Sequence, residues 1–109
     1  MAKIDQVNEI IKHELALAVN RELALPEVLV TITYVELSSD YKYARVGFSV
    51  LPDRLAGTAM KKLKASSGVL ADILRKRTKL RRIPHFNWMF DATEREAADI
   101  EAFMGNLEE

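Results

Sequence analysis

The sequence predicts one α+β domain, in which a three-stranded sheet packs against helices. The chain has 109 residues, enough for a single domain, and 49% of them are hydrophobic, which suits a packed core. Apolar residues recur at helical spacing in two long stretches. Three shorter runs are rich in β-branched and aromatic residues, which favour strands. We therefore expect residues 1–109 to form a single domain.

The first half of the chain predicts a helix followed by a hairpin. The helix spans Ile4 to about Ala24, and Pro26 prevents its continuation. A strand is expected from Val28 to Val35, and the short polar side chains of Ser38-Ser39-Asp40 then favour a turn. A second strand runs from about Tyr43 to Val50, with alternating buried and wetter positions.

The second half predicts helix, kink, helix, strand and a short helix. The apolar pattern resumes after Pro52-Asp53 and is interrupted at Ser66-Ser67-Gly68. Serine hydroxyls can cap a new helix and glycine tolerates unusual dihedral angles, so we expect a kink there. His85 to Asp91 alternates aromatic with other residues and predicts a third strand. Thr93-Glu94-Arg95-Glu96 is a capping box that predicts a short C-terminal helix.

Composition excludes several classes of protein. The chain contains no cysteine, which excludes disulfides and zinc–thiolate sites and suits a reducing compartment. Residues Met1–Asp5 become polar too early for a signal peptide. No apolar run approaches the roughly 20 residues that span a bilayer. We expect a cytoplasmic protein without membrane contact.

The sequence offers little support for catalysis. His13 and His85 are the two histidines, and neither has a partner at catalytic or metal-binding spacing, so both are expected at the surface. The four glycines are isolated from one another, which argues against a phosphate-binding loop. The alternating aromatic residues of the third strand could stack bases, but strict alternation favours packing in the core.

The charges are unevenly distributed although the formal net charge is zero. Between Met60 and Arg82 there are nine basic residues and a single acidic one, Asp72. From Ile83 onward acidic residues dominate, and Arg95 is the single basic residue. Because neighbouring acids are nearly absent, we expect no intrahelical pairing to neutralise the basic block. It predicts binding to a polyanion, RNA or DNA, while a solvated helical surface is the alternative.

Several segments together resemble one known family. They are Thr31–Asp40, Tyr43–Val46, Leu63–Leu70, Lys79–Pro84 and the strand that ends at Asp91. In order and spacing they resemble ribosome-binding factor A over nearly the whole chain. The resemblance implies a type II KH-like fold, in which an Ala-x-Gly kink between two helices replaces the usual Gly-x-x-Gly loop. Here the kink maps onto Ser66-Ser67-Gly68, and Ala71 stands where relatives commonly carry an arginine.

The resemblance also implies a function without catalysis or cofactor. It implies binding to the immature small ribosomal subunit and its 16S rRNA, with a role in late maturation and cold adaptation. We expect a monomer whose RNA contacts are Arg45, Lys64, Ser66, Ser67, Gly68, Arg75, Lys76, Lys79, Arg81 and Arg82. Gly68 and the two serines could touch RNA or could only shape the kink. The alternative function is a protein–protein adaptor that docks a partner through its acidic C-terminal helix.

Overall fold

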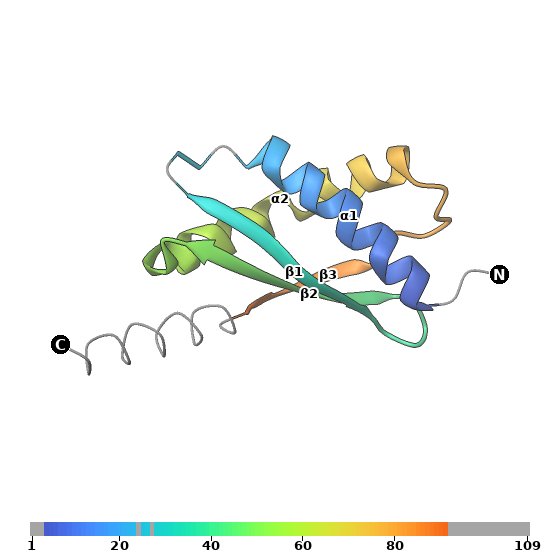
Figure 1. Ribbon diagram of the computed structural model, residues 1–109. Helices are drawn as coiled ribbons and strands as arrows, with labels where there is room; N and C mark the ends of the chain where they lie inside the picture. Colours follow the sequence, from blue (N-terminus) through green and yellow to red (C-terminus); the bar gives the residue numbers. More distant parts are fainter. Residues whose placement is uncertain (1–3, 24, 27, 92–109) are drawn as a thin grey trace.

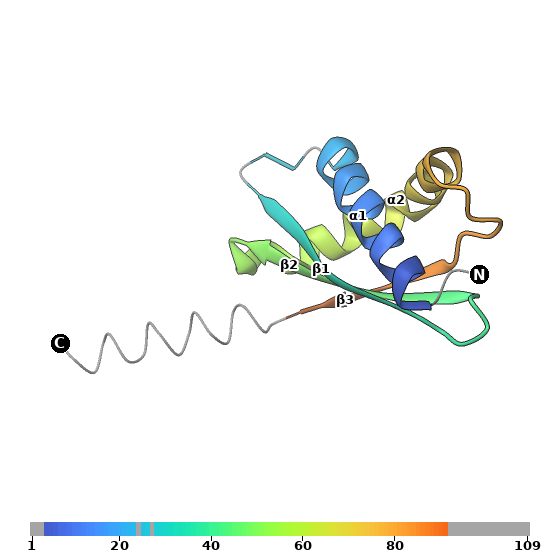
Figure 2. The same ribbon diagram turned by 45° about the vertical axis from the view of Figure 1, so that its right-hand side comes forward.

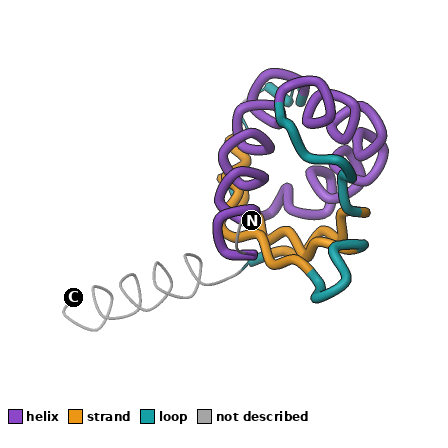
Figure 3. The backbone as a smooth tube through the Cα atoms, turned by 90° about the vertical axis from the view of Figure 1, so that its right-hand side faces the viewer, coloured by secondary structure: helices purple, strands orange, loops and turns teal. Residues whose placement is uncertain are grey.

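The computed structural model describes residues 4–23, 25–26 and 28–91. Within these residues the elements are α1 (Ile4–Glu22), β1 (Leu29–Leu37), β2 (Tyr43–Leu51), the 3-10 helix η1 (Asp53–Leu55), α2 (Ala56–Arg77) and β3 (His85–Phe90). Both long helices lie on one side of the sheet, so the molecule has two layers (Figures 1 and 3). The predicted α+β arrangement is therefore confirmed. The expected C-terminal helix lies outside the described residues.

The sheet has the order β1-β2-β3, with β2 in the centre. β1 and β2 form the predicted hairpin, paired antiparallel from Leu29 opposite Leu51 to Leu37 opposite Ala44, with a register shift between Ile32 and Tyr34. β3 pairs parallel with β2, so α2 serves as the crossover connection that parallel strands require. This mixed sheet is consistent with the type II KH-like fold that the resemblance implies.

The core lies between the two helices and the inner face of the sheet. Its buried side chains come from one stripe of each helix and from alternate positions of each strand. They are Val7, Ile11, Leu15, Ala18, Val19, Val30, Ile32, Val35, Ala44, Val46, Phe48, Val50, Ala59, Leu63, Leu70, Leu74, Phe86 and Trp88. Full burial of one large aliphatic or aromatic side chain stabilises the fold by roughly 1.5–3 kcal/mol. The expectation that the aromatic residues of β3 pack inward is confirmed for Phe86 and Trp88, and Phe90 is partly buried against the same core.

The three residues of the expected kink lie within one continuous helix. α2 extends unbroken through Ser66-Ser67-Gly68, which corrects the prediction of an interruption between two helices. Gly68 does not adopt a positive φ, and the Ser67 hydroxyl donates to the Leu63 carbonyl at 3.0 Å. A serine that bonds back to the preceding turn often bends a helix. The path of α2 bends accordingly along its length (Figure 2).

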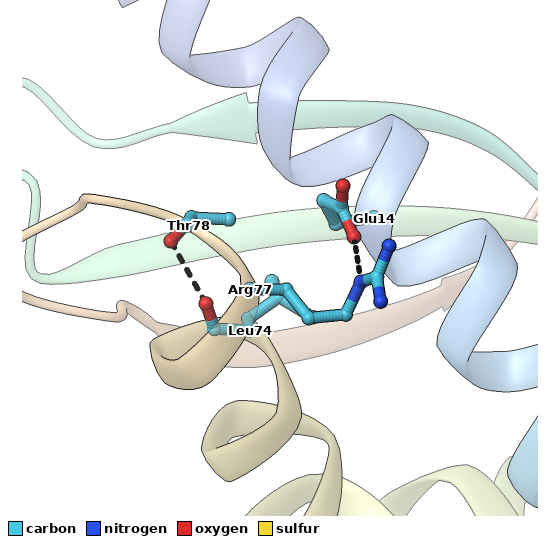
Figure 4. Close-up of polar contacts among 4 residues, drawn as sticks. All are labelled: Glu14, Leu74, Arg77 and Thr78. Carbon is cyan, nitrogen blue, oxygen red and sulfur yellow. Dashed lines mark hydrogen bonds and ion pairs between the residues drawn. The ribbon is translucent and has the colours of Figure 1, made fainter.

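The C-terminal end of α2 is held by a cap and by an ion pair. The backbone N–H and the hydroxyl of Thr78 both donate to the Leu74 carbonyl, at 2.9 and 2.8 Å. Nε of Arg77 lies 2.7 Å from Oε2 of Glu14, which joins the end of α2 to α1 (Figure 4). Arg77 therefore contributes to helix packing rather than to the free basic surface. None of the helices described here is long and apolar enough to cross a membrane.

Candidate nucleic-acid interface

A groove lies between α2 and β3. One part, of about 620 Å³, is lined by Arg45, Lys64, Ser67 and the first five residues of β3, His85–Met89. An adjoining part, of about 580 Å³, is lined by Lys42, Ser67, Gly68, Ala71 and residues 82–86. Because both parts share Ser67, His85 and Phe86, we treat them as a single α2–β3 groove.

The α2–β3 groove is positively charged. Its lining includes Lys42, Arg45, Lys64 and Arg82, all exposed, and none of the described carboxylates lines it. Within the described part of the chain, only Arg45 of these four has an ion-pair partner, Glu36 at 3.8 Å. Both side chains of that pair are more than 60% exposed, and such pairs contribute about 0–1 kcal/mol. A phosphate group can therefore replace Glu36 as the partner of Arg45.

One wall of the groove is fixed by a hydrogen bond between α2 and β3. The indole Nε1–H of Trp88 donates to the Ser67 hydroxyl at 2.8 Å. That hydroxyl in turn donates to the Leu63 carbonyl, so Ser67 is engaged both as donor and as acceptor. Ser67 therefore holds the two walls of the groove together. Ser66 does not line the groove, and its hydroxyl makes no hydrogen bond within the described residues.

Gly68 opens the wall of the groove beside Ser67. A Cβ added at Gly68 would meet no atom within 4 Å, and its φ is not in the left-handed region. Neither packing nor backbone conformation therefore requires glycine at this position. A glycine inside a helix destabilises it by roughly 0.5–1 kcal/mol relative to alanine. The absence of a side chain leaves open space beside the helix backbone at this point of the groove.

A rigid turn between β1 and β2 presents Lys42 at the groove. Oδ1 of Asp40 accepts hydrogen bonds from the Ser38 hydroxyl at 2.6 Å and from the Lys42 N–H at 3.0 Å. These two hydrogen bonds lower the pKa of the Asp40 carboxyl below its ordinary value, and the bond from Ser38 has the larger effect. The Lys42 carbonyl accepts from the His85 N–H at 2.9 Å, which joins this turn to the start of β3.

Sequence reasoning missed Lys42 as a binding candidate. Lys42 lies outside the basic block, and the parallel pairing that sets Tyr43 opposite His85 is a long-range contact. A local signal did exist, because Lys42 lies two residues after the predicted turn and directly before the strand that carries Arg45. Lys42 and Arg45 thus form a second basic cluster in the sequence, smaller than the basic block between Met60 and Arg82.

The structure brings together half of the predicted binding residues. Those that line the α2–β3 groove are Arg45, Lys64, Ser67, Gly68 and Arg82. The others, Ser66, Arg75, Lys76, Lys79 and Arg81, lie outside it. Lys76 and Lys79 are exposed at the end of α2 and just after it. The basic block is therefore divided between the groove and the surface around it.

The expectation that intrahelical pairing does not neutralise the basic block is wrong for one of its arginines, and a second arginine pairs with another helix. Arg75 pairs with Asp72, which lies three residues earlier on the same helix. Arg77 pairs with Glu14 of α1, a partner that the sequence around α2 does not contain. An acid three residues away on a helix is within reach of a basic side chain, so the single acid of the block was sufficient to pair with Arg75.

The described residues contain no group of three or more His, Asp or Glu side chains that could hold a metal ion. His13 is exposed on α1, and His85 is exposed at the start of β3, as expected. The ring of His85 lies 6.1 Å from that of Tyr43 in an edge-to-face arrangement. His85 lines both parts of the groove, so the groove contains an aromatic ring as well as four cations.

Comparison with known proteins identifies the family. A model of the family described as ribosome-binding factor A matches residues 3–104. The chain belongs to this family. Ribosome-binding factor A of Brevibacillus brevis is 37% identical over 109 residues, which covers 96% of this chain and 88% of the relative.

Solved structures of the family share the fold. The crystal structure of ribosome-binding factor A from Thermus thermophilus aligns with a TM-score of 0.72 at 22% identity, over 81% of this chain and 96% of that one. A second Thermus thermophilus structure is a homology model fitted into a cryo-EM map of a 30S complex with ribosome-binding factor A. It aligns with a TM-score of 0.65 at 24% identity, over 75% of this chain and 88% of that one.

Proposed function

We propose that this chain is a non-catalytic ribosome-binding factor of the cytoplasm, which associates with the free or immature small ribosomal subunit. In this proposal it assists late processing and maturation of 16S rRNA and works as one RNA-binding domain without a cofactor. The observation that carries the proposal is the charge of the α2–β3 groove. Four cations line this groove, and none of the described carboxylates does. Family membership supports it, as does the Thermus thermophilus relative that was fitted into a 30S complex.

The groove would hold a segment of the rRNA backbone. Lys64 from α2 and Arg45 from β2 line one part of the groove, while Lys42 and Arg82 line the other. Phosphates held along this length release counterions, and the two arginines add bidentate geometry. The open surface at Gly68 lets the RNA approach the helix backbone. These contacts are to phosphate and sugar, so they position the protein on folded rRNA rather than select a base sequence.

The basic residues outside the groove have a weaker role in this proposal. Lys76, Lys79 and Arg81 are exposed and would attract RNA over a longer range. Arg75 is paired with Asp72 and contributes less to that attraction. We therefore expect the groove cations to contribute most to RNA binding, the unpaired cations outside the groove less, and Arg75 least.

Sedimentation with purified small subunits tests the proposal. The chain should co-sediment with free small subunits, but not with large subunits, and the association should weaken as salt rises. Lys42→Glu and Lys64→Glu should each reduce affinity on the order of tenfold, equivalent to about 1.4 kcal/mol. Each should also lower the slope of log affinity against log salt by about 1.

Arg21→Glu is the matched control, because Arg21 is an exposed cation on α1 that does not line the groove. It makes the same change of charge and should leave subunit binding unchanged. Absence of association with small subunits at low salt would sink the proposal. If Arg21→Glu weakened binding as much as Lys64→Glu, the groove would not be the interface.

A further inference from the structure

A second, apolar groove lies on the α1 side of the segment that leads into β3. Its volume is about 360 Å³. It is lined by Val7 and Ile11 of α1, Leu37 and Tyr41 around the β1–β2 turn, and Leu80, Arg81, Arg82 and Pro84. We call it the α1 groove. Arg82 and Pro84 line both grooves, so the two are neighbours on the surface.

The lining of the α1 groove is aliphatic, with cations at its edge. Val7, Ile11, Leu37, Leu80 and Pro84 contribute only carbon side chains. The polar side-chain groups are the Tyr41 hydroxyl and the guanidinium groups of Arg81 and Arg82. None of the described carboxylates lines the groove, and neither arginine has an ion-pair partner within the described residues. The groove therefore lacks the negative charge that would complement it.

Tyr41 is held at this groove in an unusual backbone conformation. Its φ is 62°, the one positive value among the described non-glycine residues, and its side chain is 41% exposed. Such a conformation is strained for a residue other than glycine. The Tyr41 N–H donates to the Ser38 carbonyl at 3.0 Å, and the bonds of Asp40 described above hold the rest of the turn. The turn thus keeps an aromatic ring beside the apolar groove instead of burying it.

We propose that the α1 groove docks an acidic segment of a protein partner that presents one large apolar side chain. The apolar side chain would enter between Ile11, Leu37 and Pro84, with the Tyr41 ring over it. Acidic residues on either side would pair with Arg81 and Arg82. Charge complementarity selects this occupant, because two unpaired arginines flank a groove without carboxylates.

The same lining disfavours an RNA base as the occupant. A base carries hydrogen-bonding groups along its edge, and burying such a group without a partner is unfavourable. The aliphatic floor of the α1 groove offers those groups no side-chain partner. An aliphatic or phenyl side chain has no such requirement. This docking surface goes beyond the proposed rRNA contacts and does not depend on them.

Titration of the full chain with a synthetic peptide, followed by NMR, tests this inference. The probe is a short peptide in which Asp and Glu residues flank a central Leu-Phe pair. A control peptide keeps the acids and replaces the pair by two serines. The Leu-Phe probe should shift the methyl signals of Val7, Ile11 and Leu37 and should bind at least tenfold more tightly than the serine control.

Two variants connect this binding to the groove. Tyr41→Gly removes the ring and suits the positive φ, so the protein should fold with unchanged or higher stability and bind the probe about tenfold more weakly. Arg81→Glu should also weaken probe binding, while Arg21→Glu, the same change of charge elsewhere on the surface, should not.

Equal binding of both peptides, or unchanged probe binding by a folded Tyr41→Gly variant, would overturn the docking proposal. A Tyr41→Gly variant that lost affinity for protein-free 16S rRNA but not for the probe would assign the α1 groove to a base instead, which also overturns it. Failure of the rRNA proposal is recognised independently, because it would appear as normal subunit binding by Lys64→Glu.

Discussion

The Trp88 indole N–H donates a hydrogen bond to the Ser67 hydroxyl at 2.8 Å, which joins β3 to α2 at the wall of the α2–β3 groove. Trp88 is 5% exposed and packs edge-to-face against Phe48, whose ring centroid lies 6.4 Å away. The bond therefore connects the hydrophobic core directly to the proposed binding surface. Together with the buried residues of α2, this contact holds the helix over β3 at the wall of the groove.

Removal of the Ser67 hydroxyl should destabilise the fold. Ser67→Ala leaves the buried Trp88 N–H without a partner, and an unsatisfied buried donor costs about 1–3 kcal/mol. Chemical denaturation followed by the fluorescence of Trp88, the single tryptophan of the chain, measures the effect. Ser66→Ala is the matched control, because the Ser66 hydroxyl makes no hydrogen bond within the described residues. Equal stability of the two variants would contradict a structural role for the Ser67–Trp88 bond.

Gly68→Ala should separate stability from binding. Alanine is the better helix former by roughly 0.5–1 kcal/mol, and the added methyl group meets no atom within 4 Å, so the free energy of unfolding should rise. The same methyl group closes part of the groove wall, so affinity for the small subunit should fall several-fold. Denaturation and sedimentation of the same sample check both effects. A loss of stability would show that the bend of α2 requires glycine, and the binding interpretation would then fail.

A side chain at Gly47 should be poorly tolerated. Gly47 lies opposite Tyr34 in the β1–β2 pair, and a Cβ added there would lie 2.0 Å from Cε2 of the Tyr34 ring. Gly47→Ala must therefore displace the ring, at a cost of typically 1–3 kcal/mol for overpacking. Gly57→Ala is the control, because its Cβ would meet nothing. Thermal denaturation should show a lower midpoint for Gly47→Ala and no decrease in midpoint for Gly57→Ala.

The ionisation of Tyr34 offers a second measurement of the same displacement. Burial, followed by the nearby Glu36 carboxylate, raises the pKa of the Tyr34 hydroxyl above its ordinary value. Movement of the ring toward solvent in Gly47→Ala should shift this pKa back toward about 10. Spectrophotometric titration of the tyrosines in the two glycine variants would detect the difference. An unchanged titration together with unchanged stability would mean that the strand accommodates the methyl group without moving Tyr34.

The β1–β2 turn should loosen only in acid. The Ser38 hydroxyl and the Lys42 N–H lower the pKa of Asp40 in the folded protein. Because the folded value lies below the unfolded value, the stabilisation is complete above an unfolded pKa of about 3.9 and is lost as the pH falls through the folded pKa. NMR titration of the Asp40 carboxyl carbon and the Lys42 amide should show this. Ser38→Ala should raise the pKa of Asp40 toward its ordinary value, and a variant that left it unchanged would contradict the cause assigned here.

Much of the fold could be predicted because its signals are local. The β-branched run before Ser38-Ser39-Asp40 and the alternating run after it indicated the hairpin, and both strands extend only one or two residues beyond their predicted ends. The kink was harder to predict. Serine and glycine permit either a break or a bend, and the choice depends on the bond between Ser67 and Leu63 and on what α2 packs against.

The candidate site was only partly predictable. Charge in the sequence pointed to the stretch from Lys64 to Arg82, but it could not separate Lys64 and Arg82 from Arg77, which pairs with Glu14 across two helices. It also could not place Lys42 beside His85, since these residues meet only when β3 pairs with β2. The electrostatic interaction between two charges depends on their distance in space. A charged residue that is distant in sequence therefore affects a site as strongly as a sequence neighbour does once folding places it there.

The sequence by itself determined the two long helical regions, the hairpin, the third strand and the excess of positive charge before residue 83. These features depend on hydrophobic periodicity and composition, which are properties of short stretches of the chain. The tertiary structure alone decided which cations share a groove, that Glu14 neutralises Arg77, and that Tyr41 stands beside an apolar groove. These outcomes depend on the parallel pairing of β2 with β3 and on the packing of α1 against α2. Such contacts join residues that are distant in sequence, and no local pattern in the chain specifies them.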